Sequence, residues 1–267
     1  MRTTILSMGA GVNSVACLLK YWNLYKHVIF ADTMVEKAGT YWYIRNFLKP
    51  FCESKGINWI TVRNRWNEPL HEHYARLHTM PNQKFRMCTR EFKIEPIMKK
   101  VEELGATPES PFHEHIGIAY DERKRAKFTK HEVDWLVKEF PMVRDNITRQ
   151  DCVDIIKGHG WPVPIKSGCE GCFYASRKDL VLFARNRPKE FLKWVHLEET
   201  AKNYPKYKWH RSGKPLRPLM HVGNLDAFME EQPESCDEGY CMEFGAEPDT
   251  HDEDLRQEVL LARQVQS

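Results

Sequence analysis

The sequence predicts an α/β protein in which a parallel sheet is covered by helices on both faces and is followed by a mostly helical C-terminal part with a cysteine metal site. Short apolar stretches alternate with longer segments of helical periodicity over roughly the first 160 residues, and strand–helix–strand order builds parallel sheets. A glycine-rich turn directly follows the first apolar run, and the pattern becomes mainly helical after Pro162 and Pro164. We therefore expect an α/β domain over residues 1–165 and a helical region over residues 166–267.

The expected strands are short, and polar or glycine-containing segments separate them. They fall at residues 3–6, 27–31, 58–62 and 115–119, of which the last three read HVIFA, NWITV and HIGIA. Helical spacing of apolar residues predicts helices over residues 13–25, 39–55, 93–104 and 148–157. Thr148 and Asp151 fit a capping box at the start of the last of these. Beyond residue 165, we expect helix over most of 176–202 and again over 253–264.

The composition is that of an ordinary globular protein. The chain has 267 residues, of which 42% are hydrophobic and 29% charged, and its formal net charge of +3 does not demand a nucleic-acid partner. No run approaches the roughly 18 apolar residues of a membrane span, and the first residues lack the charged-then-apolar pattern of a signal peptide. We expect a cytoplasmic protein without a membrane partner, whose eight cysteines stay reduced.

The stretch SMGAGVNS, residues 7–14, predicts an anion-binding loop. It lies between the first expected strand and the first expected helix, where a glycine-rich turn presents backbone N–H groups and the positive end of the helix dipole to a phosphate. Gly9 and Gly11 provide the turn, and Ser7 and Ser14 add hydroxyl donors. The alternative is a tight turn that uses glycine only for its backbone freedom.

A dinucleotide-binding fingerprint is a rival interpretation of the same loop. Gly9-x-Gly11-x-x-Ser14 is close to G-x-G-x-x-G/A, and Asp32 stands 23 residues after Gly9, near the place of a ribose-binding acid. Against it, the third small position is a serine, and the residues around Asp32 point elsewhere.

Asp32 opens the stretch DTMVEKAGTYWYI. Together with the loop, this stretch resembles the sulfonucleotide (PAPS) reductase family of the adenine-nucleotide α-hydrolase, or PP-loop, superfamily. The resemblance implies a HUP-type (Rossmann-like) sheet, with phosphates on the loop and with Asp32 and Thr33 at the nucleoside. Asn13 stands in the place of the family's loop aspartate, and Met34 in the place of its turn glycine.

Three further stretches extend the resemblance over residues 3–175. CTREFKIEPI (88–97) is similar to the family's Cys-x-x-Arg-x-x-Lys segment, GIAYDERKRA (117–126) to its Gly-Ile-Arg-x-Asp-Glu-x-x-Arg segment, and FPMVRDNITRQDC (140–152) to a late Tyr-Pro-Leu segment. Read physically, Arg90, Lys93, Arg123 and Arg125 would supply cations around a polyanionic nucleotide. We expect Arg90, Lys93 and Arg125 to be the catalytic residues and Gly117 to lie at the nucleotide. The alternative is that runs such as ERKR are solvated faces. The family's Glu-Cys-Gly-x-His tail, which holds its catalytic cysteine, has no counterpart beyond SCDEGYCMEF.

The cysteines fall into two groups. Cys17, Cys52 and Cys152 sit in helical apolar patterns and are expected to be small core residues. The other five, at positions 88, 169, 172, 236 and 241, point to metal or redox chemistry in a reducing compartment.

The stretch KSGCEGCFY places Cys169 and Cys172 at C-x-x-C spacing in a glycine-rich turn, which lets two thiolates reach one metal centre. Cys88 and Cys241 complete the ligand set that we expect, and Cys236 is the alternative to Cys241. The resemblance favours a [4Fe–4S] cluster, because cluster-bearing reductases of the family also draw cysteines from the middle and later parts of the chain. Zinc and a redox dithiol are the alternatives.

Two stretches interleave basic and aromatic side chains, ARNRPKEF (184–191) and YPKYKWHRSGKP (204–215). Cations for phosphates and flat rings for bases suit a single-stranded or tRNA-like substrate. The alternative is an ordinary surface on which lysines extend over aromatic rings.

Three functions remain open. The first is an enzyme of sulfur metabolism, similar to PAPS reductases, that binds ATP or a sulfonucleotide, with or without magnesium, next to the cluster and uses a thioredoxin-like thiol reductant. The second is an ATP-dependent sulfurtransferase or modifying ligase that acts on tRNA or DNA. The third is a non-catalytic nucleotide-binding protein with structural zinc. The expected helix at 253–264 can pack on the body or form a homodimer contact, and the sequence does not decide between them.

Overall fold

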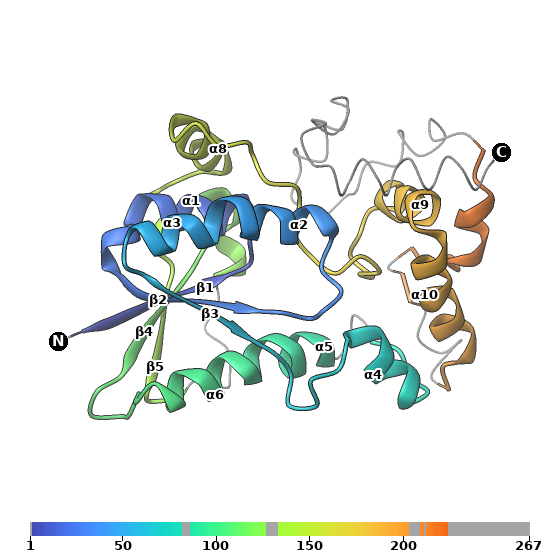
Figure 1. The fold of residues 1–267 in the computed structure, drawn as a ribbon, viewed down its shortest axis with the longest axis horizontal. Coiled ribbons are helices and arrows are strands. Elements are labelled where there is room, and N and C mark those ends of the chain that lie inside the picture. Colours follow the sequence, from blue (N-terminus) through green and yellow to red (C-terminus); the bar gives the residue numbers. More distant parts are fainter. Residues whose placement is uncertain (1, 82–85, 127–132, 203–208, 211, 224–267) are drawn as a thin grey trace. The chain divides into compact units, whose positions relative to one another are not determined.

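Figure 1 shows the fold of the protein as a computed structural model. The structure describes residues 2–81, 86–126, 133–202, 209–210 and 212–223. The chain forms two compact units: the first contains residues 1–70 and 88–169, and the second contains residues 71–87 and the chain from residue 170 onward. The sheet lies in the first unit. Among the described residues, no helix combines the length and apolar composition that crossing a bilayer needs.

Five strands of the described chain form one sheet, and each pairs in parallel with its neighbours. The order is β3 (Asn58–Val62), β2 (Tyr25–Ala31), β1 (Thr3–Met8), β4 (Phe112–Ile116) and β5 (Leu136–Glu139). The predicted parallel sheet is therefore confirmed, and its order is that of a Rossmann-like fold. Chain order reverses between β1 and β4, which makes the crevice at their carboxyl ends the expected ligand position in an open α/β sheet.

Helices cover both faces of the sheet, as predicted (Figure 1). One face carries α1 (Val12–Tyr21), α2 (Ala38–Tyr43), α3 (Lys49–Ser54) and α8 (Arg149–Gly158), and the other carries α6 (Glu95–Glu103). Leu6 and Val28 point into the α1 face, whereas their neighbours Ile5 and Ile29 point into the α6 face. This alternation follows from the two-residue period of a strand.

Two long helical stretches contain a π-helical turn. The turn Ile44–Leu48 joins α2 to α3, and the turn Arg90–Ile94 joins α5 (Met87–Thr89) to α6. The helices predicted over 39–55 and 93–104 are thus present, and the second begins six residues earlier than predicted. The helix predicted over 148–157 is also present: Thr148 caps α8, with reciprocal bonds between Thr148 and Asp151.

Some predicted boundaries were wrong. The strand placed at 115–119 is β4, which ends at Ile116 because Gly117 turns against the start of α1 and Ile118 N donates back to Ile116 O at 3.0 Å. The helix placed over 13–25 ends at Tyr21, and a 3₁₀ turn (Trp22–Leu24) leads into β2. The sequence analysis missed β5, α4 (Leu70–Arg76) and the short α7 (Pro141–Arg144).

The second unit contains α9 (Arg177–Asn186), α10 (Pro188–Thr200) and a 3₁₀ helix η5 (Arg217–His221). The mostly helical character predicted over 176–202 is confirmed. Ser176 caps α9 by accepting a bond from Asp179 N, and Pro188 opens α10. Trp194 and Trp209 pack edge to face in the core of this unit, with their ring centroids 5.1 Å apart. The helix predicted at 253–264 lies outside the described residues.

A chain of polar groups crosses the α1 face and ends at Glu139, whose side chain is 24% exposed. His115 Nδ1 lies 3.0 Å from the Tyr25 hydroxyl, which lies 3.2 Å from Cys17 Sγ, and His115 Nε2 lies 3.2 Å from Glu139 Oε2. Cys17, like Cys52 and Cys152, is fully buried, as predicted, and burial raises the pKa of each of these thiols to about 12. These three cysteines are inert core residues.

Candidate functional site

The 7–14 loop forms the turn from β1 into α1. Gly9, Ala10 and Gly11 connect Met8, the last residue of β1, to Val12, the first of α1. Gly11 is the N-cap, and its carbonyl accepts the first helical bond from Val15 N at 3.0 Å. Glycine has no side chain to cap the helix, so the N–H groups of the first turn receive no side-chain cap. Uncapped helix N-termini of this kind suit an anion.

Three glycines near this turn differ in what an added Cβ atom would contact. A Cβ on Gly117 would lie 2.7 Å from Ser14 Cα, so β4 can end against α1 only without a side chain there. A Cβ on Gly11 would lie 2.8 Å from Ser167 Oγ. A Cβ on Gly9 would meet nothing closer than Ser14 Oγ at 3.8 Å. The packing of the free protein therefore explains Gly117 and leaves Gly9 unexplained.

Both polar atoms of the Asn13 side-chain amide are hydrogen-bonded. Its Nδ2 donates to Glu122 Oε2 at 3.0 Å, and its Oδ1 accepts from Arg149 Nη1 at 2.9 Å. Arg125 Nη1 donates to the same Glu122 oxygen at 2.6 Å. This network ties the start of α1 to the segment after β4. An aspartate at position 13 would place a carboxylate against Glu122, so the amide suits this surrounding better.

The Ser7 and Ser14 hydroxyls both bond to other groups of the protein. Ser7 lies in β1 and its hydroxyl bonds to Glu114 on the α6 face, whereas Ser14 Oγ donates to Gly11 O at 3.0 Å. The predicted phosphate contacts of the loop would therefore come from the backbone. These two hydroxyls are engaged within the protein.

Asp32 and Thr33 follow β2 at the same edge of the sheet. Asp32 Oδ1 accepts from Tyr41 Oη at 2.7 Å and from Met34 N at 2.8 Å, and its Oδ2 accepts from Arg63 Nε at 3.3 Å. Met34 has φ of +61°, a left-handed conformation that favours glycine. A residue with a side chain thus holds a left-handed conformation at this turn. Burial, with Asp32 adding to it, raises the pKa of Tyr41, so its hydroxyl remains a donor.

The sequence analysis missed Glu36, which is 3% exposed beside this turn. Its Oε1 lies 3.2 Å from Lys93 Nζ and accepts from Thr33 Oγ1 at 3.2 Å. Cys169 Sγ lies 3.3 Å from the same Thr33 hydroxyl, and the two backbones of Glu36 and Cys169 form an isolated bridge. The signal was a carboxylate four residues after Asp32 and two residues before a helix. Glu36, in the stretch that Asp32 opens, thus contacts both Lys93 of the 88–97 stretch and the turn that holds Cys169.

The predicted phosphate-binding cations already have carboxylate partners. Lys93 pairs with Glu36, Arg125 with Glu122, and Arg90 Nε with Glu95 Oε1 at 3.1 Å. The Arg90 and Arg125 side chains are 52% and 59% exposed. The Arg90–Glu95 pair is exposed at both ends, and such pairs are weak, so an anionic ligand would separate it at small cost. In the Arg125 pair the Glu122 side chain is only 9% exposed.

A hollow of about 170 Å³ opens at the carboxyl ends of β1 and β2. Gly9, Phe30, Ala31, Lys93 and Ile97 are among the residues that line it. It lies beside the start of the 9–11 turn, so a ligand on this turn would have space next to it.

The structure places the cysteines of the proposed centre in different surroundings. Cys88 lies in α5 and Cys169 at the bridge to Glu36, both in the first unit. Cys172 belongs to the second unit, where its Sγ accepts from Tyr174 N at 3.4 Å. Cys236 and Cys241 lie outside the described residues. Within the described part of the chain, no group of three or more His, Cys, Asp or Glu side chains is placed to hold a metal ion.

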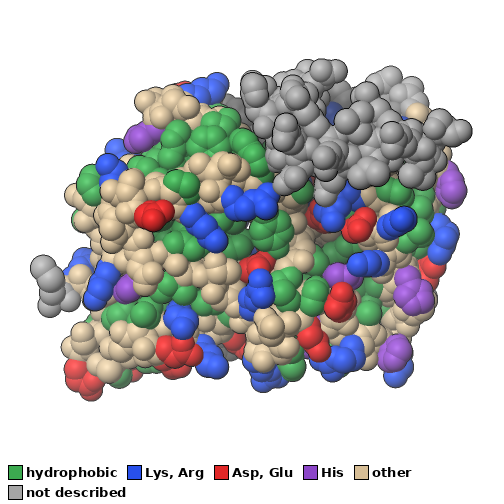
Figure 2. Space-filling model, viewed as in Figure 1, with side chains coloured by type: hydrophobic (Ala, Val, Ile, Leu, Met, Phe, Trp, Pro, Cys, Tyr) green, Lys and Arg blue, Asp and Glu red, His purple; other side chains and the backbone are tan. Residues whose placement is uncertain are grey.

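Two aromatic residues of the predicted nucleic-acid surface are buried. Trp209 Nε1 donates to Gly171 O at 2.8 Å, and His210 Nε2 lies 2.8 Å from Ala175 O. Both side chains belong to the core of the second unit, so the idea that they stack on bases was wrong. Residues 203–208 and 211 lie outside the description. On the face drawn in Figure 2, described Lys and Arg side chains are interspersed with Asp and Glu.

No family model matches the chain, and no curated protein matches its sequence. Among solved structures, the crystal structure of phosphoadenylyl-sulfate (PAPS) reductase from Candida auris, in complex with phosphate, is similar to it. The two share 17% sequence identity with a TM-score of 0.44, over 61% of this chain and 76% of that one. A likeness of this size says nothing about what this chain binds or catalyses.

Proposed function

We propose that the protein is an enzyme that binds an adenine nucleotide at the carboxyl edge of its sheet, of the sulfonucleotide-reductase kind. One observation carries the proposal: segments far apart in sequence interlock around the 9–11 turn. Ser14 packs on Gly117, Asn13 bonds to Glu122, and Lys93 pairs with Glu36. These are the segments whose sequences resemble the family, and they surround the topological switch point of the sheet.

Each residue has a role in this proposal. Backbone N–H groups at the start of α1 would hold the phosphates, and Gly9 would let them approach. Arg90, Lys93 and Arg125 would balance the phosphate charge by exchanging their present carboxylate partners for the ligand. Asp32 and Thr33 would lie at the nucleoside.

The metal centre is a second part of the proposal, and it is tested separately from the nucleotide site. Cys88, Cys169, Cys172 and Cys241, with Cys236 as the alternative, have the thiolate chemistry of an iron–sulfur or zinc centre. The described residues bring no three such donors together, so no step of the proposed chemistry goes through a cluster. Iron, sulfide and zinc analysis of anaerobically purified protein tests this part separately.

Calorimetry tests the nucleotide site. ATP or a sulfonucleotide should bind with micromolar or better affinity, about 8 kcal/mol. Gly9→Ala should keep the fold, because its Cβ has space, and should weaken nucleotide binding by blocking backbone approach. Gly158→Ala, at the exposed end of α8 where a Cβ meets nothing within 4 Å, is the matched control and should bind normally. Tight binding of NAD alone would establish the dinucleotide alternative.

Product analysis distinguishes the reactions. A reductase should remove the sulfate group of a sulfonucleotide as sulfite, and the remaining product should be the nucleotide with its phosphate. Reduced thioredoxin supplies the two electrons and becomes a disulfide. Release of AMP and pyrophosphate with tRNA or DNA would instead identify the sulfurtransferase alternative. Binding without either reaction would identify a non-catalytic nucleotide-binding protein.

A further inference from the structure

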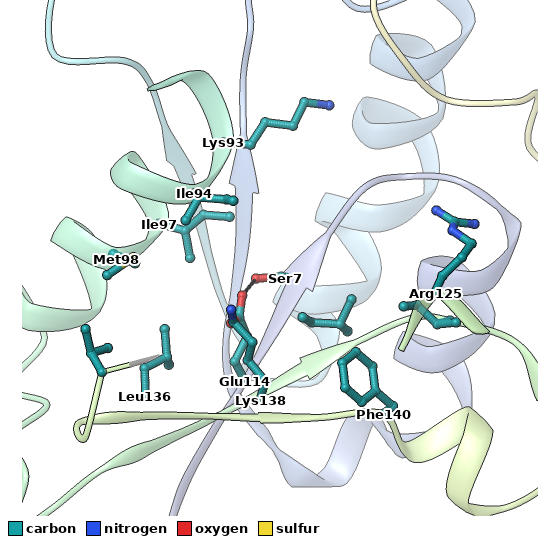
Figure 3. Close-up of a pocket in the computed structure, with 13 residues that line it drawn as sticks. Ser7, Lys93, Ile94, Ile97, Met98, Glu114, Arg125, Leu136, Lys138 and Phe140 are labelled. Atoms are coloured by element: carbon teal, nitrogen blue, oxygen red, sulfur yellow. Dashed lines mark hydrogen bonds between the residues drawn. The ribbon is translucent and has the colours of Figure 1, made fainter. Parts of the chain in front are cut away.

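A second, larger hollow lies on the α6 face of the sheet, with a volume of about 240 Å³ (Figure 3). Its walls are mainly apolar. Ile94, Ile97 and Met98 line it from the helical segment. Ile116 in β4, Ile118 in the following turn and Phe140 just after β5 line the opposite side. A dry cavity of about 150 Å³ holds one benzene ring. This cavity therefore has room for a flat ring system larger than one ring.

One acidic side chain reaches this apolar space. Glu114 lines the cavity from the middle of β4, although the residue is only 6% exposed. The Ser7 hydroxyl bonds to its Oε1, and Figure 3 shows the two side chains meeting across β1 and β4. Burial raises the pKa of Glu114, and the Ser7 bond and the charge of Lys138 offset only part of this rise. The carboxyl group is thus driven toward its neutral form.

The cavity shares part of its lining with the smaller hollow at the carboxyl edge of the sheet. Ser7, Lys93 and Ile97 line both this cavity and the smaller hollow that reaches Gly9. A strand rises about 3.3 Å per residue, so Ser7 and Gly9 are separated by less than the length of a nucleoside's sugar and base. A ligand whose phosphates lie on the 9–11 turn can extend a ring into the cavity.

We propose that this cavity takes the base of the bound nucleotide and that the Glu114 carboxyl, positioned by Ser7, selects adenine; this rests on the proposed function. Apolar walls with one or two placed polar groups are the usual design of a small-molecule site. Lys93 stands between the two hollows and carries the charge that a phosphate needs.

The chemistry of the carboxyl favours adenine over guanine. A neutral carboxyl group offers one O–H donor and one carbonyl acceptor. Adenine presents the complementary pair, the N7 acceptor beside the N6 amino donor, whereas guanine presents N7 and O6, which are both acceptors. Guanine would therefore leave the carbonyl oxygen of Glu114 facing another acceptor.

Two substitutions test this role without threatening the fold. Glu114→Leu replaces a buried carboxyl by an apolar group of similar size, and Glu114→Gln keeps one donor and one acceptor. Glu114→Leu should weaken ATP binding by about tenfold or more, the loss expected of a bidentate base contact, and should narrow the difference between ATP and GTP. Glu114→Gln should bind ATP nearly as the unmodified protein does and should keep the preference.

Methyl NMR with adenosine gives an independent readout, because adenosine has no phosphate to bind the loop. With ¹³C-labelled isoleucine methyls, adenosine should shift Ile94, Ile97, Ile116 and Ile118, which line the cavity, and should leave Ile156, in the core of the α1 face, unshifted. If ATP binds and depends on Gly9 while Glu114→Leu binds ATP normally and the cavity methyls stay unshifted, this inference is overturned and the proposed function stands. If no adenine nucleotide binds, both are overturned.

Discussion

Glu114 and His115 are consecutive residues of β4, yet they lie in opposite kinds of surroundings. His115 points into the α1 face, where it joins Tyr25, Cys17 and Glu139 in a chain of hydrogen bonds inside a continuous core. Glu114 points into the α6 face, where it lines a cavity and Ser7 is its bonded partner among the described side chains. The same strand therefore serves a packed face and a hollow one.

The difference separates structural polar groups from functional ones. On the α1 face, polar groups satisfy one another, and such a network specifies a unique core. On the α6 face, a carboxyl group is buried next to empty space, which costs stability unless a ligand compensates. A polar group that is buried next to empty space in the ligand-free protein indicates a binding site better than burial alone does.

The largest expected effect is on packing. Leu18→Ala, in the buried core of the α1 face, should lower the free energy of unfolding by about 3–5 kcal/mol, because the transfer term and a new cavity add together. Met98→Ala, which only enlarges an existing hollow, should cost about 1–2 kcal/mol, because fewer contacts are lost. Urea unfolding measures both. Equal costs would mean that the α6 face is packed as tightly as the α1 face.

An intermediate effect is expected where the two faces meet at the end of β4. Gly117→Ala places a Cβ 2.7 Å from the backbone of Ser14, and such overpacking should cost about 1–3 kcal/mol of stability. The substitution should also weaken nucleotide binding, since it moves the start of α1. Gly158→Ala meets no neighbour within 4 Å and serves as the control. A Gly117→Ala protein of unchanged stability would show that the two segments do not touch in solution.

The smallest effect is a pH dependence that has opposite signs on the two faces. Burial raises the pKa of Glu114 above its ordinary 4.5, so its contribution to stability is present below that pH and is lost as pH rises through the folded-state pKa. Burial lowers the pKa of His115 below its ordinary 6.5, despite the opposing effect of Glu139, so its contribution is lost as pH falls.

Glu114→Gln isolates the acidic half of this comparison. The variant should gain stability relative to the unmodified protein as pH rises from 4 to 8, by about 1.4 kcal/mol for each unit of pKa difference. The variant should still lose stability below pH 6.5, because His115 is unchanged in it. Unfolding curves at several pH values measure this. Parallel stability profiles for the two proteins would place Glu114 in contact with water.

The sequence predicted the regular parts of the fold well because local signals and tertiary packing agree there. The 58–62 strand and the capping box at Thr148 appear as expected. It failed where a distant contact decides: β4 ends at Ile116 because Gly117 meets Ser14, a contact across about a hundred residues that no local pattern shows. The edge strand β5 is only four residues long, and Val137 in it is 39% exposed, so its apolar signal is weak.

The candidate site shows the same division. Motif order predicted that the loop, Asp32 and the arginines would be near one another, and the structure brings Asn13, Arg125 and Gly117 together. It could not predict that Ser7 turns to Glu114 or that Glu36 anchors Lys93, because both depend on which face a side chain occupies and on partners from other strands. The buried Trp209 and His210 looked like surface residues for the same reason.

A crystal structure of the full chain with ATP tests the central claim most directly. The account predicts phosphate density at the backbone N–H groups of the first turn of α1, next to Gly9, with Arg125 or Lys93 turned from its carboxylate partner toward the phosphates. ATP density elsewhere, with the 9–11 turn empty and the pairs of Lys93 with Glu36 and Arg125 with Glu122 intact, would contradict it.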